Sequence, residues 1–108
     1  MSLLRHAVHR DREEPSVVKA FRAGGATVDY LSAKGMPDLL VGYLGVTHLV
    51  ECKTDNAMPN ADQKAWADAW RGEKPEIVRN AAQARKLLRM WTMACANQSR
   101  SEALEADR

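Results

Sequence analysis

The chain lacks the features that mark secreted, membrane-spanning and disulfide-stabilised proteins. Its two cysteines, Cys52 and Cys95, form no C-x-x-C pair. No apolar stretch of the secretory kind is present, and the longest apolar runs fall far short of the ~20 residues that span a bilayer. We therefore expect a cytoplasmic protein with two reduced thiols and no membrane partner.

A strong excess of charge of one sign is also missing. Sixteen basic and 14 acidic residues leave a net charge of +2, which alone does not indicate a nucleic-acid partner. An apolar content of 45% and a charged content of 28% are those of an ordinary globular protein. We expect one domain over residues 1–96, with residues 1–11 as a short helix or frayed arm, and a polar, loosely ordered tail over residues 97–108.

Apolar periodicity and turn residues predict the order helix, three strands, helix, strand, helix. Asn60 and Asn80 precede the second and third helices as capping residues. A strand meander followed by a helix that crosses over to a further strand implies a mixed sheet flanked by helices, in the α/β (α+β) class. The strands are expected at residues 26–31, 38–43, 46–53 and 76–79.

The start of the first helix has two readings. Asp11 with Glu14 resembles a capping box, whereas Pro15 suits the first turn of a helix. Gly24-Gly25 marks the end of the helix in either case. Its apolar stripe is expected to face the core.

The stretch KGMPDLLVGYLGVTHLVECK, residues 34–53, reads as two apolar strands joined at Leu44-Gly45, yet it carries acids at its ends. Glu51 and Lys53 are two residues apart, so both side chains leave the same face of the sheet. A hairpin symmetric about the turn pairs position 38 with position 51, and directly opposed residues have Cβ atoms roughly 5 Å apart. Asp38, Glu51 and Lys53 are therefore expected to converge.

This convergence favours a functional acidic cluster over its simpler interpretation, a solvent-facing Glu–Lys pair. The neighbouring Leu49 and Val50 suggest strands covered on both faces, where a charged side chain without a function is unfavourable. A divalent cation with oxygen ligands would relieve the repulsion between two close carboxylates. The chemistry that such a site serves is phosphodiester hydrolysis, in which metal ions neutralise phosphate charge and a lysine assists the attacking water. Magnesium suits a hard oxygen site best.

The sequence GMPD, followed thirteen residues after Asp38 by ECK, resembles the PD-(D/E)xK nuclease superfamily. Within it, the chain is most similar to the small VRR-NUC-type nucleases of phages and bacteria, over residues 13–90. The resemblance implies a restriction-endonuclease-like αβββαβ core with an added C-terminal helix. It also implies Asp38 and Glu51 as metal-binding acids, Lys53 as the catalytic lysine, the carbonyl of Cys52 as a further ligand, and Mg²⁺, with Mn²⁺ as a substitute.

Glu14 matches the glutamate that this family carries on its first helix, as a further ligand of the metal or of water. It lies on the side of the helix that carries the apolar stripe. The competing interpretation is a carboxylate that caps the helix N-terminus, and Glu13 competes for the site role.

Gln63 matches the helix glutamine that, in resembling proteins, holds the lysine or the substrate phosphate. It also fits a capping box with Asn60, because N-x-x-Q is the pattern of that motif. The sequence leaves both interpretations open.

Basic residues offer candidate phosphate contacts, although such residues are often only solvated. Lys34 precedes the acidic cluster, and a basic face of the third helix carries the other candidates. His6, His9 and His48 have no convincing metal spacing and receive no role. The tryptophans at 66, 70 and 91 are interpreted as core anchors rather than base-stacking platforms. The candidates on the third helix are Arg85, Lys86 and Arg89.

These observations predict a metal-dependent deoxyribonuclease that selects DNA structure, with little sequence specificity. The resemblance implies branched or junction DNA as the substrate. No helix-turn-helix or comparable reading module is present. One active site per chain favours a homodimer when both strands must be cut. The alternatives are a non-catalytic DNA-binding or assembly module that retains the fold, and a hydrolase or metal-binding protein with a non-nucleic substrate.

Overall fold

The structure, a computed structural model, describes residues 12–106. The predicted order of elements is confirmed, and the fold is a mixed α+β one. The expectation for residues 1–11 lies outside the described residues. The elements are α2 (Glu14–Ala23), β1 (Thr27–Tyr30), β2 (Leu39–Tyr43), β3 (Val46–Cys52), α3 (Ala61–Ala69), β4 (Glu76–Val78) and α4 (Ala81–Ala106).

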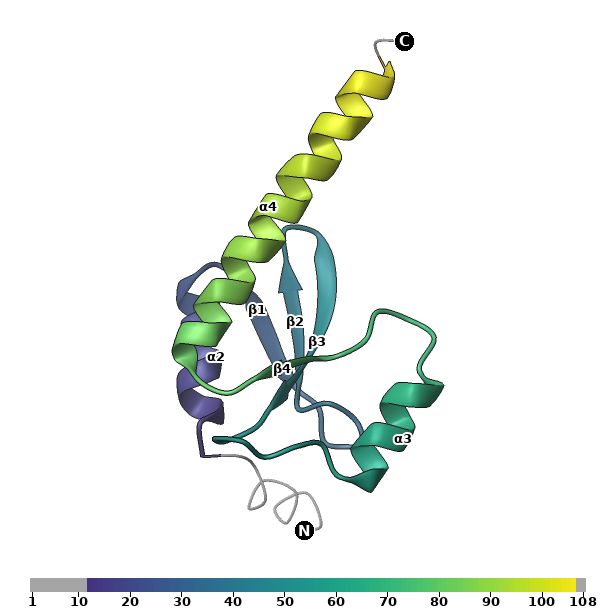
Figure 1. Ribbon diagram of the computed structural model, residues 1–108. Coiled ribbons are helices and arrows are strands. Elements are labelled where there is room, and N and C mark those ends of the chain that lie inside the picture. The colour runs from purple at the N-terminus through teal and green to yellow at the C-terminus, as the bar shows by residue number, and fades with distance from the viewer. Residues whose placement is uncertain (1–11, 107–108) are drawn as a thin grey trace.

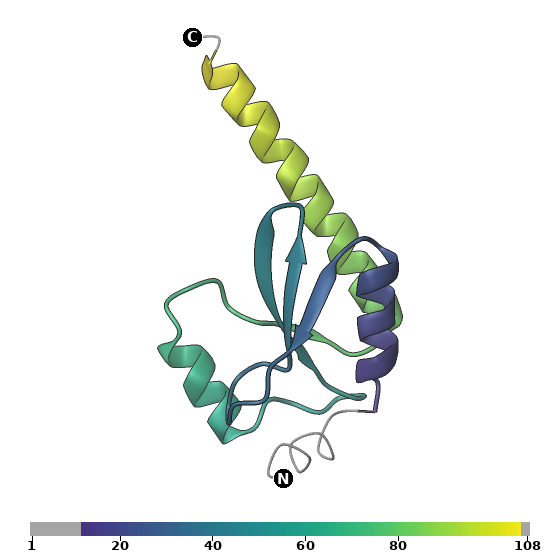
Figure 2. The ribbon, with the colours of Figure 1, turned by 180° about the vertical axis from the view of Figure 1, so that it is seen from behind.

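The four strands form one sheet in the order β1-β2-β3-β4. The first three pair antiparallel as a meander, and β4 returns parallel to β3 after α3. Helices α2 and α4 lie side by side on one face of this sheet, whereas α3 stands apart from both (Figures 1 and 2). The mixed sheet therefore arises because the α3 segment is a crossover connection.

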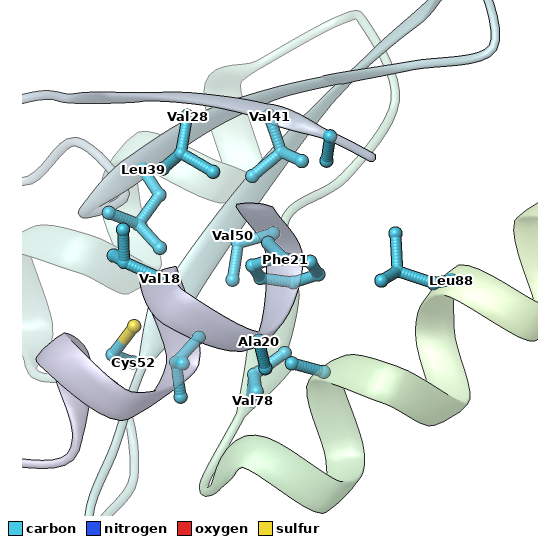
Figure 3. Packing of buried hydrophobic residues seen from close by; sticks show 13 residues of the cluster. Val18, Ala20, Phe21, Val28, Leu39, Val41, Val50, Cys52, Val78 and Leu88 are labelled. Atoms are coloured by element: carbon cyan, nitrogen blue, oxygen red, sulfur yellow. The ribbon is translucent and has the colours of Figure 1, made fainter. Parts of the chain in front are cut away.

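The core lies between the sheet and the α2–α4 pair (Figure 3). Alternate residues of β2 and β3 point into it, and Val50 is fully buried beneath Phe21 of α2. Trp91 of α4 stacks on Phe21 with ring centroids 5.8 Å apart, so this tryptophan packs against the core as predicted. The core thus fixes α2 against the strands that carry the acidic residues.

The hairpin turn has the conformation that sets the predicted register. Leu44 and Gly45 both have positive φ, at 50° and 79°, as in the two-residue turns that match strand twist. Tyr43 pairs with Val46 and Leu39 with Val50. Counting one step further outward places Asp38 opposite Glu51, as expected from the sequence.

The helix N-termini bear on the capping predictions, although Asp11, which the predicted box of the first helix requires, lies outside the described residues. Pro15 lies in the first turn of α2, whose N-cap, Glu13, makes no side-chain capping bond. At α3, Asn60 and Gln63 form a reciprocal capping box. Asn80 accepts a bond from the main-chain nitrogen of Gln83 at 2.9 Å, so it caps α4 as predicted.

Three sequence expectations are wrong. Helix α3 buries no residue, so Trp66 and Trp70 are not core anchors; their i, i+4 spacing defines a face that covers no core. The segment from Asn97 is helical to Ala106 rather than loosely ordered, because α4 continues without a break. The sheet is not fully covered on both faces, since Leu49 is only half-buried on the face opposite the core. Within residues 12–106, no helix combines the length and apolar content that a membrane crossing requires.

Candidate active site

Three acidic side chains from three elements meet at the end of the sheet nearest the start of α2. Side-chain ligand atoms of Glu14, Asp38 and Cys52 all lie within 4.8 Å of one another. The Asp38 Oδ2 atom accepts a hydrogen bond from the main-chain nitrogen of Cys52 at 2.7 Å. Glu51 adjoins Asp38 closely enough for their carboxyl groups to share a hydrogen bond. The structure therefore brings together Glu14, Asp38 and Glu51.

The local folding of each element explains why these acids meet. Strand β3 alternates, so Val50 and Cys52 enter the core while Glu51 lies between them on the opposite face. Asp38 directly precedes β2. Its main-chain carbonyl accepts a hydrogen bond from the main-chain nitrogen of Leu31 at 2.8 Å, which holds this position beside the end of β1. Glu14 is the first residue of α2, and the packing of that helix on the core carries it to the strand ends.

The structure distinguishes the two candidate glutamates of the first helix. Glu14 is 2% exposed and belongs to the acidic cluster. Glu13 is half-buried and lines a separate polar cavity with Asp55 and Arg79. Geometry thus places Glu14, not Glu13, beside Asp38.

Glu51 is buried next to another acid, Asp38, and both conditions disfavour its ionised form. Burial, the hydrogen bond to Asp38 and the charge of Asp38 together raise the pKa of Glu51 to about 9, although the positive charge of Lys53 acts to lower it. Glu51 is 4% exposed, and among residues 12–106 its Oε1 atom has no hydrogen-bond partner. A buried acceptor of this kind is normally satisfied.

These donors fit a divalent cation. Clustered carboxylates are the ligands that hard cations prefer, and an ion would satisfy the buried Oε1 atom of Glu51. The sequence resemblance implied the carbonyl of Cys52 as a ligand, and the structure adds that its thiol also faces Glu14 and Asp38. A sulfur neighbour was not expected, because the sequence reading considered only oxygen ligands at this site.

Lys53 follows β3 directly and is anchored by its main-chain nitrogen, which donates to the carbonyl of Val78 at 3.1 Å. Its positive charge lowers the pKa of Glu51, so the Lys53 side chain acts on the carboxyl group that is hydrogen-bonded to Asp38. The Gln63 Oε1 atom accepts a bond from the nitrogen of Asn60 at 2.9 Å, which is the capping interaction. Gln63 also lines the cavity that reaches Glu51, so capping and a place beside the site coexist.

A cavity of about 510 Å³ opens from Glu51 toward α3. Its walls are mostly apolar, and two lysines, Lys64 and Lys74, lie among them. The sequence reading did not select these lysines, because nothing near them marks a motif. Only the adjacency of Lys64 to Gln63 pointed to the site. The lining residues are Gly35, Pro37, Glu51, Met58, Pro59, Gln63, Lys64, Trp66, Ala67, Asp68, Lys74, Pro75 and Ile77.

The basic residues expected to contact DNA do not line this cavity. Lys34 is exposed, and its Nζ atom lies 3.8 Å from a carboxylate oxygen of Asp62. Arg85 and Arg89 line a different groove, between α2, α4 and the hairpin, and Lys86 is exposed on the same helix. The structure therefore separates the α4 candidates from the acidic cluster.

His48 lies apart from the acidic cluster, on the core face of the sheet. Its ring stacks on Trp91 with centroids 3.7 Å apart, and Nδ1 lies 3.1 Å from Glu73 Oε1. The ring of His48 therefore takes part in the packing of α4 on the sheet.

Comparison with known proteins gives one informative similarity. No protein-family model matches the chain, and no curated protein matches it in sequence. A solved structure described as "VRR_NUC domain" is similar to the chain with a TM-score of 0.61 and 30% sequence identity. The similarity covers 72% of this chain and 91% of the solved one.

Proposed function

This chain belongs to the VRR-NUC family of nuclease domains, and on that premise we propose that it is a metal-dependent endonuclease that hydrolyses phosphodiester bonds of DNA. The observation that carries the proposal is the cluster of Glu14, Asp38 and Cys52, in which Asp38 is also hydrogen-bonded to Glu51. Gathering several carboxylates in a buried place is unfavourable, so a site built from them is best explained by a function that uses them.

Each residue of the cluster has a role in the proposal. Glu14, Asp38 and Glu51 hold Mg²⁺, with Mn²⁺ as a substitute, and the Cys52 carbonyl completes the ligand set. When bound, the ion neutralises phosphate charge and lowers the pKa of a coordinated water. Lys53 orients or deprotonates the attacking water and offsets the negative charge that develops on the phosphate.

The substrate that we propose is DNA with a distinctive structure, such as a branch or junction, rather than a particular sequence. Within residues 12–106 at least one strand separates each helix from the next, so these residues contain no helix-turn-helix. Lys34 on the loop before β2 and Lys86 on α4 are proposed to contact flanking phosphates, which position DNA without reading its sequence.

The first prediction separates this function from a non-catalytic DNA-binding module. Wild type is expected to cleave at least one member of a panel of single-stranded, double-stranded and branched DNAs in Mg²⁺ or Mn²⁺, and none in EDTA. Asp38→Asn and Lys53→Ala are each expected to reduce cleavage by on the order of 10³-fold, because each removes a group that acts on the reacting centre. Gel analysis of labelled DNA gives the measurement.

Matched controls for these variants lie outside the cluster. Asp29→Asn changes an exposed acid of β1, and Lys19→Ala changes an exposed lysine of α2. Both are expected to cleave like wild type. A wild type that binds the panel without cutting any member in either metal would indicate the non-catalytic module. Unchanged binding and cleavage in Asp38→Asn would likewise contradict the proposed role of the acids.

A homodimer is part of the proposal, and α4 is its proposed contact. The C-terminal half of α4 projects beyond the sheet (Figures 1 and 2). This half carries Glu102, Glu105 and the 60%-exposed Leu104. The other half carries Arg85 and Arg89 on a groove of about 620 Å³. In an antiparallel pair of α4 helices, the acidic tip of each copy would lie on the basic groove of its partner.

The second prediction tests this contact by charge exchange. Glu102→Arg with Glu105→Arg is expected to weaken dimerisation by about tenfold or more, because like charges then oppose each other. Adding Arg85→Glu and Arg89→Glu to the same chain should restore the dimer. Sedimentation velocity gives the measurement. If neither set of changes alters dimerisation, the proposed α4 contact is wrong, and the basic face of α4 is free to bind DNA.

A further inference from the structure

Helix α3 carries two tryptophans where no core exists to receive them. The rings of Trp66 and Trp70 stack with centroids 4.8 Å apart and planes 16° apart, and α3 buries none of its residues. Trp70 is 42% exposed. Large aromatic rings on a surface commonly serve recognition, because they offer apolar area at low conformational-entropy cost.

Trp66 lines the same cavity that reaches Glu51 of the acidic cluster. The volume of about 510 Å³ is within the roughly 300–1,000 Å³ usual for small-molecule sites. The apolar side chains of Met58 and Ile77 also line the cavity, so a flat apolar group entering it would meet apolar surface in addition to Trp66. The cavity is therefore both next to the proposed chemistry and suited to a planar ring.

Specific contacts hold α3 in place as a wall of this cavity. Gly35 has φ of 79°, and a Cβ there would meet the Asp62 carbonyl oxygen at 2.9 Å, so this glycine allows the loop before β2 to approach α3. Asn60 caps the start of the helix. At its end, Lys74 Nζ donates to the carbonyl of Ala67 and, at 2.7 Å, to that of Trp70.

Charge along the cavity favours a ligand that carries phosphate. Lys64 and Lys74 both line it, together with one exposed acid, Asp68, and the buried Glu51 that the proposed function assigns to the cation. A base joined to a sugar–phosphate backbone has a flat apolar ring for Trp66 and an anionic chain for these lysines. An apolar peptide would find the ring surface but would leave the lysines without counter-charges.

From these observations we infer that the cavity binds one unpaired nucleobase beside the phosphodiester that the acidic cluster hydrolyses, with Trp66 as the stacking surface. The inference rests on the proposed function and adds the feature of DNA that is recognised. A base inside a duplex is already stacked on both faces, so only an unpaired or extruded base can enter. Trp66 and Lys64 are thus substrate-binding residues, and Lys74 is a positioning residue for α3.

The test compares three DNA probes that differ at one nucleotide: an unpaired base, an abasic site at the same place, and a fully paired base. Binding is followed by fluorescence anisotropy with the full chain in Ca²⁺, so that affinity is measured apart from cleavage. Wild type is expected to bind the unpaired base about 5- to 150-fold more tightly than the abasic probe, the range that base–aromatic stacking gives elsewhere. Trp66→Ala should lose this preference, and Trp66→Phe should retain most of it.

Two results would overturn the inference. One is equal binding of the unpaired-base and abasic probes by wild type, which would mean that the cavity takes some other occupant, such as a peptide. The other is a preference that survives in Trp66→Ala. Folding of the variant is checked by circular dichroism, and Lys64→Ala, which should weaken binding of all three probes alike, gives an independent measurement of phosphate contact. Failure of the proposed function is a separate result, because it appears as absence of cleavage in Mg²⁺ whatever the base preference.

Discussion

Replacing Glu51 by glutamine is expected to slow DNA cleavage greatly and, in the absence of divalent ions, to make the protein more stable. Burial and Asp38 raise the pKa of Glu51 to about 9, so at neutral pH the folded chain must hold a proton that the unfolded chain has released. Glutamine is close in shape and needs no proton. The variant should therefore melt several degrees above wild type in EDTA, since about 1 kcal/mol corresponds to about 4–8 °C in a domain of this size.

Cleavage should fall in the same variant by on the order of 10³-fold, because glutamine cannot supply the negative charge that a divalent cation requires. Opposite changes in stability and activity are typical of a site that is strained for its function. The matched control is Asp29→Asn, which neutralises an exposed strand acid and should change neither quantity. A Glu51→Gln variant that cleaves normally, or that melts below wild type in EDTA, would contradict this account of the cluster.

The sequence predicted the fold wherever local rules and long-range packing agree. Leu44-Gly45 set the hairpin register, because only a short list of turns joins two twisted strands. Asn60 and Asn80 predicted the starts of their helices correctly, because capping is a local interaction. The tail after Asn97 was missed because polar composition does not exclude a helix that continues from a packed one.

Tryptophan spacing on α3 shows where such reasoning stops. Periodicity identifies which residues share a face, but it does not say what that face covers. Trp91 and Trp66 look alike in sequence. One packs against Phe21 in the core, and the other lines the cavity next to Glu51. The difference depends on where the crossover connection carries α3, which is a property of the whole chain.

The candidate site divides in the same way. Asp38 opposite Glu51 followed from strand parity and turn symmetry alone. The choice of Glu14 over Glu13 needed the packing of α2. The two residues are adjacent in sequence, yet the carboxylate of Glu14 is buried, whereas Glu13 lines another cavity. Lys64 and Lys74 approach the site only through the position of α3. Short-range geometry thus gave the acids, and tertiary structure supplied their surroundings.

Stability of the metal-free protein is expected to fall as pH rises from about 4.5 to about 9, and divalent ions should reverse this fall. Glu51 keeps its proton in the folded state up to about pH 9, whereas in the unfolded chain it titrates near the ordinary value of 4.5. Between these values the folded state binds one proton more than the unfolded state, so stability decreases with pH. Below pH 4.5 the group contributes no pH dependence, and above pH 9 the loss is complete.

A cation that binds the deprotonated acids competes with this proton, so its stabilising effect should grow with pH over the same range. An ion at about 100 times its Kd adds about 2.7 kcal/mol to the free energy of unfolding. Thermal melts in EDTA, Mg²⁺ and Mn²⁺ at several pH values give the measurement. Glu51→Gln should lose both the decline in EDTA and most of the response to ions, while Asp29→Asn should keep both. The variant has no carboxylate at position 51, and the buried Oε1 atom of that carboxylate is the one that an ion would satisfy. An ion effect of the same size in Glu51→Gln would therefore show that the cation binds elsewhere on the chain.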